Sequence, residues 1–168
     1  MECVLREWRE EDVKDLAYMM NNKNIQDNLR DGIPYPYTQQ DAAAFIEKMM
    51  TRDKNKLFAF AIEAEGRLVG SISVSRMDNV HSRTGEMGYY IGQDFWNKGY
   101  GSSAARQIVQ YVFDNTNIIR VFADPYAYNA ASCRALEKAG FTFEGLLRKN
   151  ALKNGKFVDM KMYAKIKE

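Results

Sequence analysis

The sequence predicts a single α/β domain in which helices flank a mixed, mostly antiparallel central sheet. Runs with helical apolar spacing alternate with strand-like runs along the whole chain, which is typical of mixed architectures. The expected strands of the first half follow one another across short turns, so they are expected to pair in antiparallel fashion. The 168 residues contain no repeat, low-complexity tract or convincing linker, and one domain over 1–168 is therefore expected.

The first half of the chain is expected to supply a short strand, three helices and a hairpin. Glu10, Glu11 and Asp12 suit the positive first turn of a helix. Two prolines hold the segment 34–37 extended, because proline fixes φ and restricts the residue before it. Thr38 then caps the next helix. The expected elements are a strand at 4–8, helices at 10–20, near 25–29 and at 38–49, and strands at 57–63 and 67–74.

The second half alternates strands and helices and ends in a hairpin. Apolar residues recur through 104–113 in a broad stripe, which predicts a buried helix. Gly140 is well placed to end the last helix, and Asn154-Gly155 is a strong signal for a hairpin turn. The expected elements are strands at 85–91 and 118–123, helices after 101 and at 129–139, and strands at 141–149 and 156–164.

A glycine-containing turn joins the strand that ends at Ile91 to the long helix. Helix N-termini present unpaired N–H groups and a positive dipole end, which together favour an anion. Gly99 and Gly101 let the backbone approach a phosphate, Lys98 adds a cation, and the next two serines add hydroxyl donors. A lone Gly-x-Gly also fits an ordinary tight turn. The hypothesis is that this turn holds a phosphorylated cofactor.

Composition excludes several classes of function. The net charge of +2 is too small for a nucleic-acid surface that works by bulk electrostatics. No apolar run reaches transmembrane length, and the first residues lack the pattern of a signal peptide, so a cytoplasmic protein without membrane contact is expected. Cys3 and Cys133 lack metal-ligand spacing and are expected to be free thiols, while His81 lies in a polar stretch. No metal is expected.

Three blocks of sequence together resemble the GNAT superfamily of N-acetyltransferases. They are Trp96-Asn97-Lys98-Gly99-Tyr100-Gly101, Asn129-x-x-Ser132 and Leu136-Glu137-Lys138-Ala139-Gly140-Phe141. Arg6-Glu7-Trp8 and the Pro34–Thr38 segment look more narrowly like the branch that acetylates N-terminal amines of bacterial ribosomal proteins, the RimJ/RimL type. The resemblance covers nearly the whole chain and implies a GNAT fold with a splayed pair of strands. Trp96 departs from the glutamine or arginine that commonly begins the cofactor loop.

The resemblance implies acetyl-CoA as the cosubstrate. Its diphosphate is expected on the turn that leads into the long helix, and its pantetheine arm is expected to lie along the preceding strand like an added strand. Asn129 is expected to bind the pantetheine amides and Arg134 a phosphate, although a helix cap and a solvated helix face are the structural alternatives for these two. The remaining expected cofactor contacts are Tyr89, Tyr90, Ile91, Lys98, Gly99, Tyr100, Gly101, Ser102 and Ser103.

The resemblance also implies direct attack by an amine, with no covalent enzyme intermediate. Glu86 is the expected general base, and an aromatic neighbourhood would raise its pKa. Ser132 is the expected proton donor to the departing sulfur. Tyr35 and Tyr37 are expected to line the acceptor groove. The structural alternatives are a surface glutamate, a helix-capping serine and tyrosines that only pack the connector.

The basicity of the acceptor favours an N-terminal α-amine. With a pKa of about 7.7–8.0, roughly a tenth of such amines is neutral at pH 7, against about 0.04% of lysine side chains. Desolvation narrows this difference. A protein N-terminus is therefore the expected acceptor, and a small amine such as an aminoglycoside, polyamine or amino acid is the alternative. A non-catalytic acyl-CoA-binding module and a purely structural domain also remain, as do both monomer and homodimer.

Overall fold

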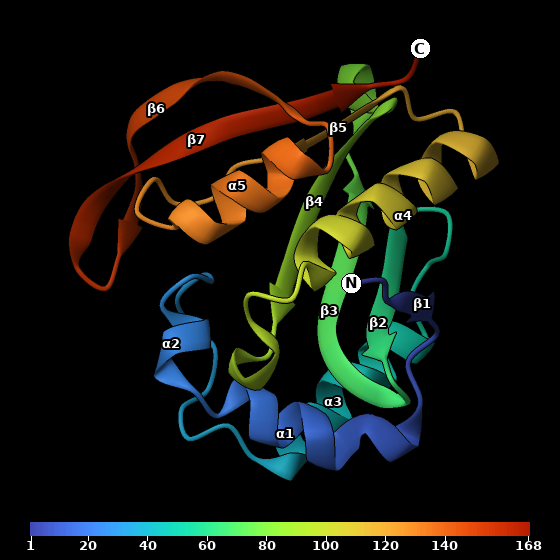
Figure 1. Ribbon diagram of the computed structural model, residues 1–168, viewed down its shortest axis with the longest axis vertical. Helices are drawn as coiled ribbons and strands as arrows, with labels where there is room; N and C mark the ends of the chain where they lie inside the picture. The colour runs from blue at the N-terminus through green and yellow to red at the C-terminus, as the bar shows by residue number, and fades with distance from the viewer.

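The computed structural model describes residues 1–168, and all seven strands form one mixed sheet (Figure 1). The strand order is β1-β2-β3-β4-β5-β7-β6. Every neighbouring pair is antiparallel except β4 with β5. The strands are β1 (Val4–Arg6), β2 (Leu57–Ala64), β3 (Arg67–Arg76), β4 (Thr84–Ile91), β5 (Arg120–Ala123), β6 (Thr142–Lys153) and β7 (Lys156–Ile166).

Helices cover both faces of this sheet, and α4 passes in front of β3 in Figure 1. The α-helices are α1 (Val13–Met20), α2 (Lys23–Gln26), α3 (Gln39–Met50), α4 (Tyr100–Asn115) and α5 (Ala130–Lys138). Short 3-10 turns are η1 (Glu10–Asp12), η2 (Asn79–His81) and η3 (Gln93–Phe95). No helix combines the length and the apolar character that crossing a bilayer requires.

Two separate cores stabilise the two faces. The larger one contains the apolar stripe of α4, including the fully buried Ala104, Ile108 and Val112, packed against β3 and β4. The second contains Leu16 of α1 and Ile46 of α3 against small side chains of β2. Burial of this kind contributes roughly 1.5–3 kcal/mol for each large side chain, so these stripes fix which helix lies on which face.

The parallel strands β4 and β5 pair over only a short length and then separate. Three residue pairs join them, and the last is Glu86 with Phe122. After Ala123 the chain stays with β7, because the Ala127 N–H donates to the Asp159 carbonyl at 2.8 Å. β4 meanwhile continues to Ile91 beside β3 alone. The expected splayed pair is therefore present, and it opens the sheet at its centre.

Most predicted elements are present, with shifted ends. The expected cap of α3 is confirmed, since Thr38 and Asp41 form a reciprocal capping box. The first strand ends at Arg6 rather than Trp8, because Trp8 turns into the second core. The final hairpin is longer than expected because β6 absorbs two irregularities of register and continues to Lys153.

Candidate active site

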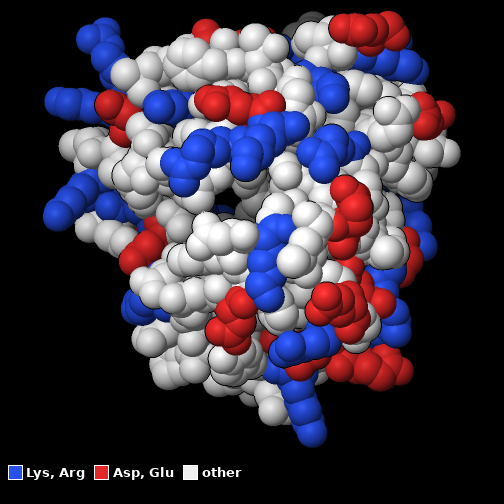
Figure 2. All heavy atoms as spheres, in the orientation of Figure 1, with Lys and Arg blue, Asp and Glu red and all other residues white.

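A cavity of about 580 Å³ lies where β4 leaves β5, between the first turns of α4 and α5. Figure 2 shows the hollow on this face, with Lys and Arg side chains gathered along its upper margin. Twelve of the expected site residues line it: Glu86, Tyr89, Tyr90, Ile91, Lys98, Gly99, Tyr100, Gly101, Ser102, Asn129, Ser132 and Arg134. Residues far apart in the sequence therefore meet at one site.

The turn before α4 presents a row of free backbone N–H groups to the cavity. Gly99 is the N-cap residue with φ of +80°, a left-handed conformation that favours glycine. The N–H groups of residues 98–102 donate to no acceptor in the chain, whereas the Ser103 N–H already donates to the Gly99 carbonyl at 3.2 Å. The Trp96 indole N–H holds the turn on the strand by donating to the Ile91 carbonyl at 2.8 Å. This arrangement fits a phosphate group.

Gly101 is required by a neighbouring ring. A Cβ at this position would lie 3.1 Å from Cε2 of Tyr89, tighter than ordinary contact. The Tyr89 hydroxyl in turn forms a 3.0 Å hydrogen bond with the hydroxyl of Ser132. Burial raises the pKa of Tyr89, so its phenol keeps its proton at neutral pH. The small residue in the turn thus makes room for a tyrosine–serine pair at the cavity wall.

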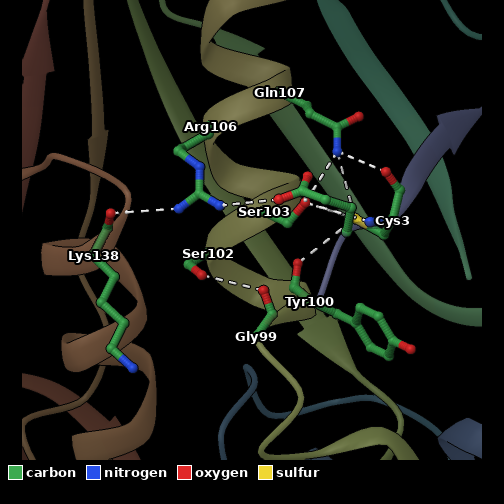
Figure 3. Close-up of polar contacts among 9 residues, drawn as sticks. Cys3, Gly99, Tyr100, Ser102, Ser103, Arg106, Gln107 and Lys138 are labelled. Carbon is green, nitrogen blue, oxygen red and sulfur yellow. Dashed lines mark hydrogen bonds and ion pairs between the residues drawn. The ribbon is translucent and has the colours of Figure 1, made fainter.

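The Ser103 side chain points away from that of Ser102, toward Cys3 and Gln107 (Figure 3). It does not line the cavity and is fully buried. Its hydroxyl donates to the Glu2 carboxylate at 2.9 Å and accepts from the Gln107 side chain at 3.1 Å. The Ser102 hydroxyl is also engaged, since it donates to the Gly99 carbonyl at 3.1 Å. The expected hydroxyl donors therefore serve the fold of α4.

Basic side chains occupy one end of the cavity. Lys98, Arg134 and Lys138 line it and are exposed to solvent. Nearby, Arg106 lies between α4 and α5, where it donates to the Lys138 carbonyl at 3.5 Å and forms an ion pair with Glu2 at 3.7 Å (Figure 3). These cations and the free N–H groups give this end a positive potential suited to phosphates.

Acidic side chains occupy the other end, at the point where the strands separate. Glu86 lies at the last β4–β5 pair, and Asp124 directly follows β5. Both line the cavity. Glu86 is exposed to solvent, as in the surface alternative stated for it, but partial desolvation still raises its pKa, and the neighbouring Asp124 carboxylate raises it further. Asp124 was missed in the sequence. The available signal was its place directly after a buried strand that runs parallel to a neighbour.

Helix α2 and the segment after it close the acidic end of the cavity. Ile25, Asn28 and Leu29 contribute to its lining. The Tyr126 hydroxyl donates to the Leu29 carbonyl at 3.0 Å, and Lys153 of β6 forms an ion pair with Asp31 at 2.9 Å. The acidic end is therefore bounded by α2, the β5–α5 loop and the last hairpin.

Asn129 acts as a helix cap, the structural alternative expected for it. Its side-chain oxygen accepts from the Ser132 N–H at 3.2 Å at the start of α5. The amide nitrogen of the same side chain has no partner in the chain. The cap and a role at the cavity are therefore compatible.

Tyr35 and Tyr37 do not line the cavity. Tyr37 is buried in the second core, and the ammonium of Lys23 lies 4.2 Å from the ring centroid of the exposed Tyr35. Tyr37 therefore packs the connector onto the second core, the alternative expected for it, whereas Tyr35 stays at the surface.

Comparison with known proteins identifies the family. Residues 3–142 match the model of the acetyltransferase (GNAT) domain. The chain is 28% identical over 165 residues to the uncharacterized N-acetyltransferase YnaD of Bacillus subtilis, covering 98% of this chain and 94% of that protein. It is 25% identical over 157 residues to spermidine N(1)-acetyltransferase of Escherichia coli, covering 91% and 80% of the two chains.

A solved structure shows the same fold. RimL, a ribosomal α-N-protein acetyltransferase in complex with coenzyme A, superposes with a TM-score of 0.86 at 20% identity, covering 99% of this chain and 95% of that chain. This likeness shows that the two chains share a fold. The chain belongs to the GNAT family of acetyltransferases. It is an acetyl-CoA-dependent N-acetyltransferase. No group of three His, Cys, Asp or Glu side chains is placed to hold a metal ion.

Proposed function

We propose that this acetyltransferase modifies the α-amine of a protein N-terminus, by direct attack in a ternary complex within the cavity between β4 and β5. The observation that carries the proposal is the division of one cavity into two ends of opposite charge. The basic end contains the open amide turn, and the acidic end contains the expected base. Such a cavity suits an anionic cosubstrate at one end and a cationic amine at the other.

The residues that fit acetyl-CoA are those of the basic end and of the free edge of β4. The diphosphate suits the N–H groups of residues 98–102, with Lys98 and Arg134 as charge partners. The pantetheine arm suits the open edge of β4 at Tyr89, because backbone groups alternate along a strand and the Tyr90 carbonyl points toward Gly70 of β3. On the same edge the Ile91 carbonyl is already occupied by the Trp96 indole N–H. When bound, the cosubstrate supplies an acetyl thioester whose sulfur leaves as a thiol.

Two side chains fit the proton transfers. Glu86 lies at the point where the strands separate and accepts a proton from the acceptor amine. Its raised pKa brings it nearer to the pKa of an amine, which improves a general base. Ser132 gives its hydroxyl proton to the departing sulfur. The hydroxyls of Tyr89 and Ser132 form a hydrogen bond, and in this proposal Tyr89 is its donor, which leaves the serine proton free to point into the cavity.

An N-terminal α-amine is supported by its basicity and by the ribosomal acceptor named for RimL. A polyamine is the second candidate, favoured by the two carboxylates at the acceptor end and by the spermidine acetyltransferase among the relatives. The two candidates differ in charge and in size.

Measuring release of coenzyme A across a panel of amines tests the proposal. The panel contains a hexapeptide with a free N-terminus, the same peptide with a blocked N-terminus and an internal lysine, spermidine, and an aminoglycoside. The largest kcat/KM is expected for the free peptide. A larger kcat/KM for spermidine would identify polyamines as the acceptors. Turnover of the blocked peptide equal to that of the free peptide would refute an α-amine acceptor.

A further inference from the structure

The register of β4 and β5 places a second carboxylate beside Glu86. Glu86 pairs with Phe122 in the parallel ladder, so these two side chains lie on the same face of the sheet. Asp124 lies two residues beyond Phe122, and strand periodicity directs it to that face as well. Gly88, two residues beyond Glu86, has no side chain and open space around its Cβ position. The cavity wall therefore carries no side chain at Gly88.

Neither carboxylate has a cationic partner in the protein. The ion pairs of the chain use Glu2, Glu7, Asp12, Asp31, Glu63 and Glu144, and none uses Glu86 or Asp124. Asp124 is half-buried, and partial burial of an unpaired carboxylate is unfavourable unless a cation or hydrogen-bond donor compensates for it. The lysine and arginine side chains that line the cavity lie on the α4 turn and on α5, and Lys153, which borders the acidic end, is already paired with Asp31.

We propose that Asp124 is the acceptor-binding residue of this site and that, together with Glu86, it receives the acceptor as an ammonium cation. This inference rests on the proposed function and adds the charge state in which the acceptor binds. One N–H bond of the ammonium breaks, its electron pair stays on nitrogen, and the proton passes to a carboxylate oxygen of Glu86. The proton then leaves to solvent. Asp124 keeps its charge and holds the amine in place.

The influence of Asp124 on the pKa of Glu86 supports this arrangement. Two effects raise the pKa of Glu86: partial desolvation and the negative charge of Asp124. The facing residues on the neighbouring strands, Ser75 of β3 and Phe122 of β5, carry no charge. Tyr126, close to Asp124, has a raised pKa and remains neutral over the working range. The charged Lys153 and Asp31 beside Tyr126 are paired with each other. Removing the charge of Asp124 therefore lowers the pKa of Glu86.

Asp124→Asn tests the proposal, because it keeps the shape of the side chain and removes its charge. Asp114→Asn is the matched control, since Asp114 is exposed on α4 and does not line the cavity. With the free-amine hexapeptide and with spermidine, Asp124→Asn is expected to raise KM for the amine about tenfold. The Kd of acetyl-CoA, measured by calorimetry without acceptor, stays unchanged. Salt raises the amine KM of the parent enzyme and has less effect on the variant.

A second measurement is independent of turnover. Carbon-13 NMR titration of Glu86 in the free protein is expected to give a lower pKa in Asp124→Asn and an unchanged one in Asp114→Asn. An amine KM and a Glu86 titration that both match the control would overturn the inference. A parent enzyme that binds acetyl-CoA but acetylates no amine in the panel would refute the proposed function instead, while the titration would still report on the carboxylate pair.

Discussion

The tyrosine–serine pair gives the sharpest test of the proposed proton donor. In Tyr89→Phe the ring stays against Gly101, while the 3.0 Å hydrogen bond to Ser132 is lost. A neutral hydrogen bond of this kind is worth about 1 kcal/mol, and about 1.4 kcal/mol corresponds to a tenfold change in rate. We therefore expect kcat to fall about fivefold. Ser132→Ala removes the donor itself, and a fall of about 100-fold is expected.

The assay is a double-mutant cycle on kcat at saturating acetyl-CoA and amine, with thermal melting to confirm that each variant is folded. Tyr89 acts only through Ser132 in this account, so Tyr89→Phe combined with Ser132→Ala should be no slower than Ser132→Ala alone. A double variant that loses the full additional fivefold would refute the reasoning, because Tyr89 would then act independently of the serine.

Three further changes test other parts of the site. Glu86→Gln is expected to lower kcat/KM by about 100-fold or more and to remove the acid limb of the pH profile of kcat/KM. In the parent enzyme this limb lies above the usual range of glutamate, because the pKa of Glu86 is raised. An unaltered pH profile would exclude Glu86 as the base. Gly101→Val forces the turn away from Tyr89, so calorimetry should show at least tenfold weaker acetyl-CoA binding, and unchanged affinity would contradict the role of the turn. Ser103→Ala should lower the free energy of unfolding in urea by about 1–2 kcal/mol and leave acetyl-CoA affinity unchanged. Weaker acetyl-CoA binding without loss of stability would show instead that the Ser103 hydroxyl contacts the cosubstrate.

Local physics made much of the fold predictable. The apolar residues of α4 around Ile108 repeat with helical spacing. Thr38 and Asp41, which form a capping box, indicate the start of α3 from only four residues of sequence. These signals depend only on neighbours in the sequence. The ends of β6 were not predictable in the same way, because its extension to Lys153 depends on pairing with β7 across irregular register.

The part of the candidate site formed by backbone N–H groups could be predicted from the sequence. The free N–H groups of the α4 turn follow from a strand, two glycines and a helix in succession. Side-chain directions were not predictable. The Glu2 carboxylate, which bonds the hydroxyl of Ser103, is distant in sequence. The same is true of the Tyr89 hydroxyl at Ser132. Asp124 lies near Glu86 because the pairing of β4 with β5 ends at Glu86 and Phe122, and this end of the pairing could not be predicted from the sequence.

The central claim is that the amide turn before α4 holds the diphosphate of acetyl-CoA while the free edge of β4 holds its arm. Amide NMR shifts on titration with coenzyme A test it most directly. Large shifts are expected at residues 98–102 and at Tyr89, with small ones at the distant Asp114. Unmoved amides at 98–102 under saturation with coenzyme A would contradict the account.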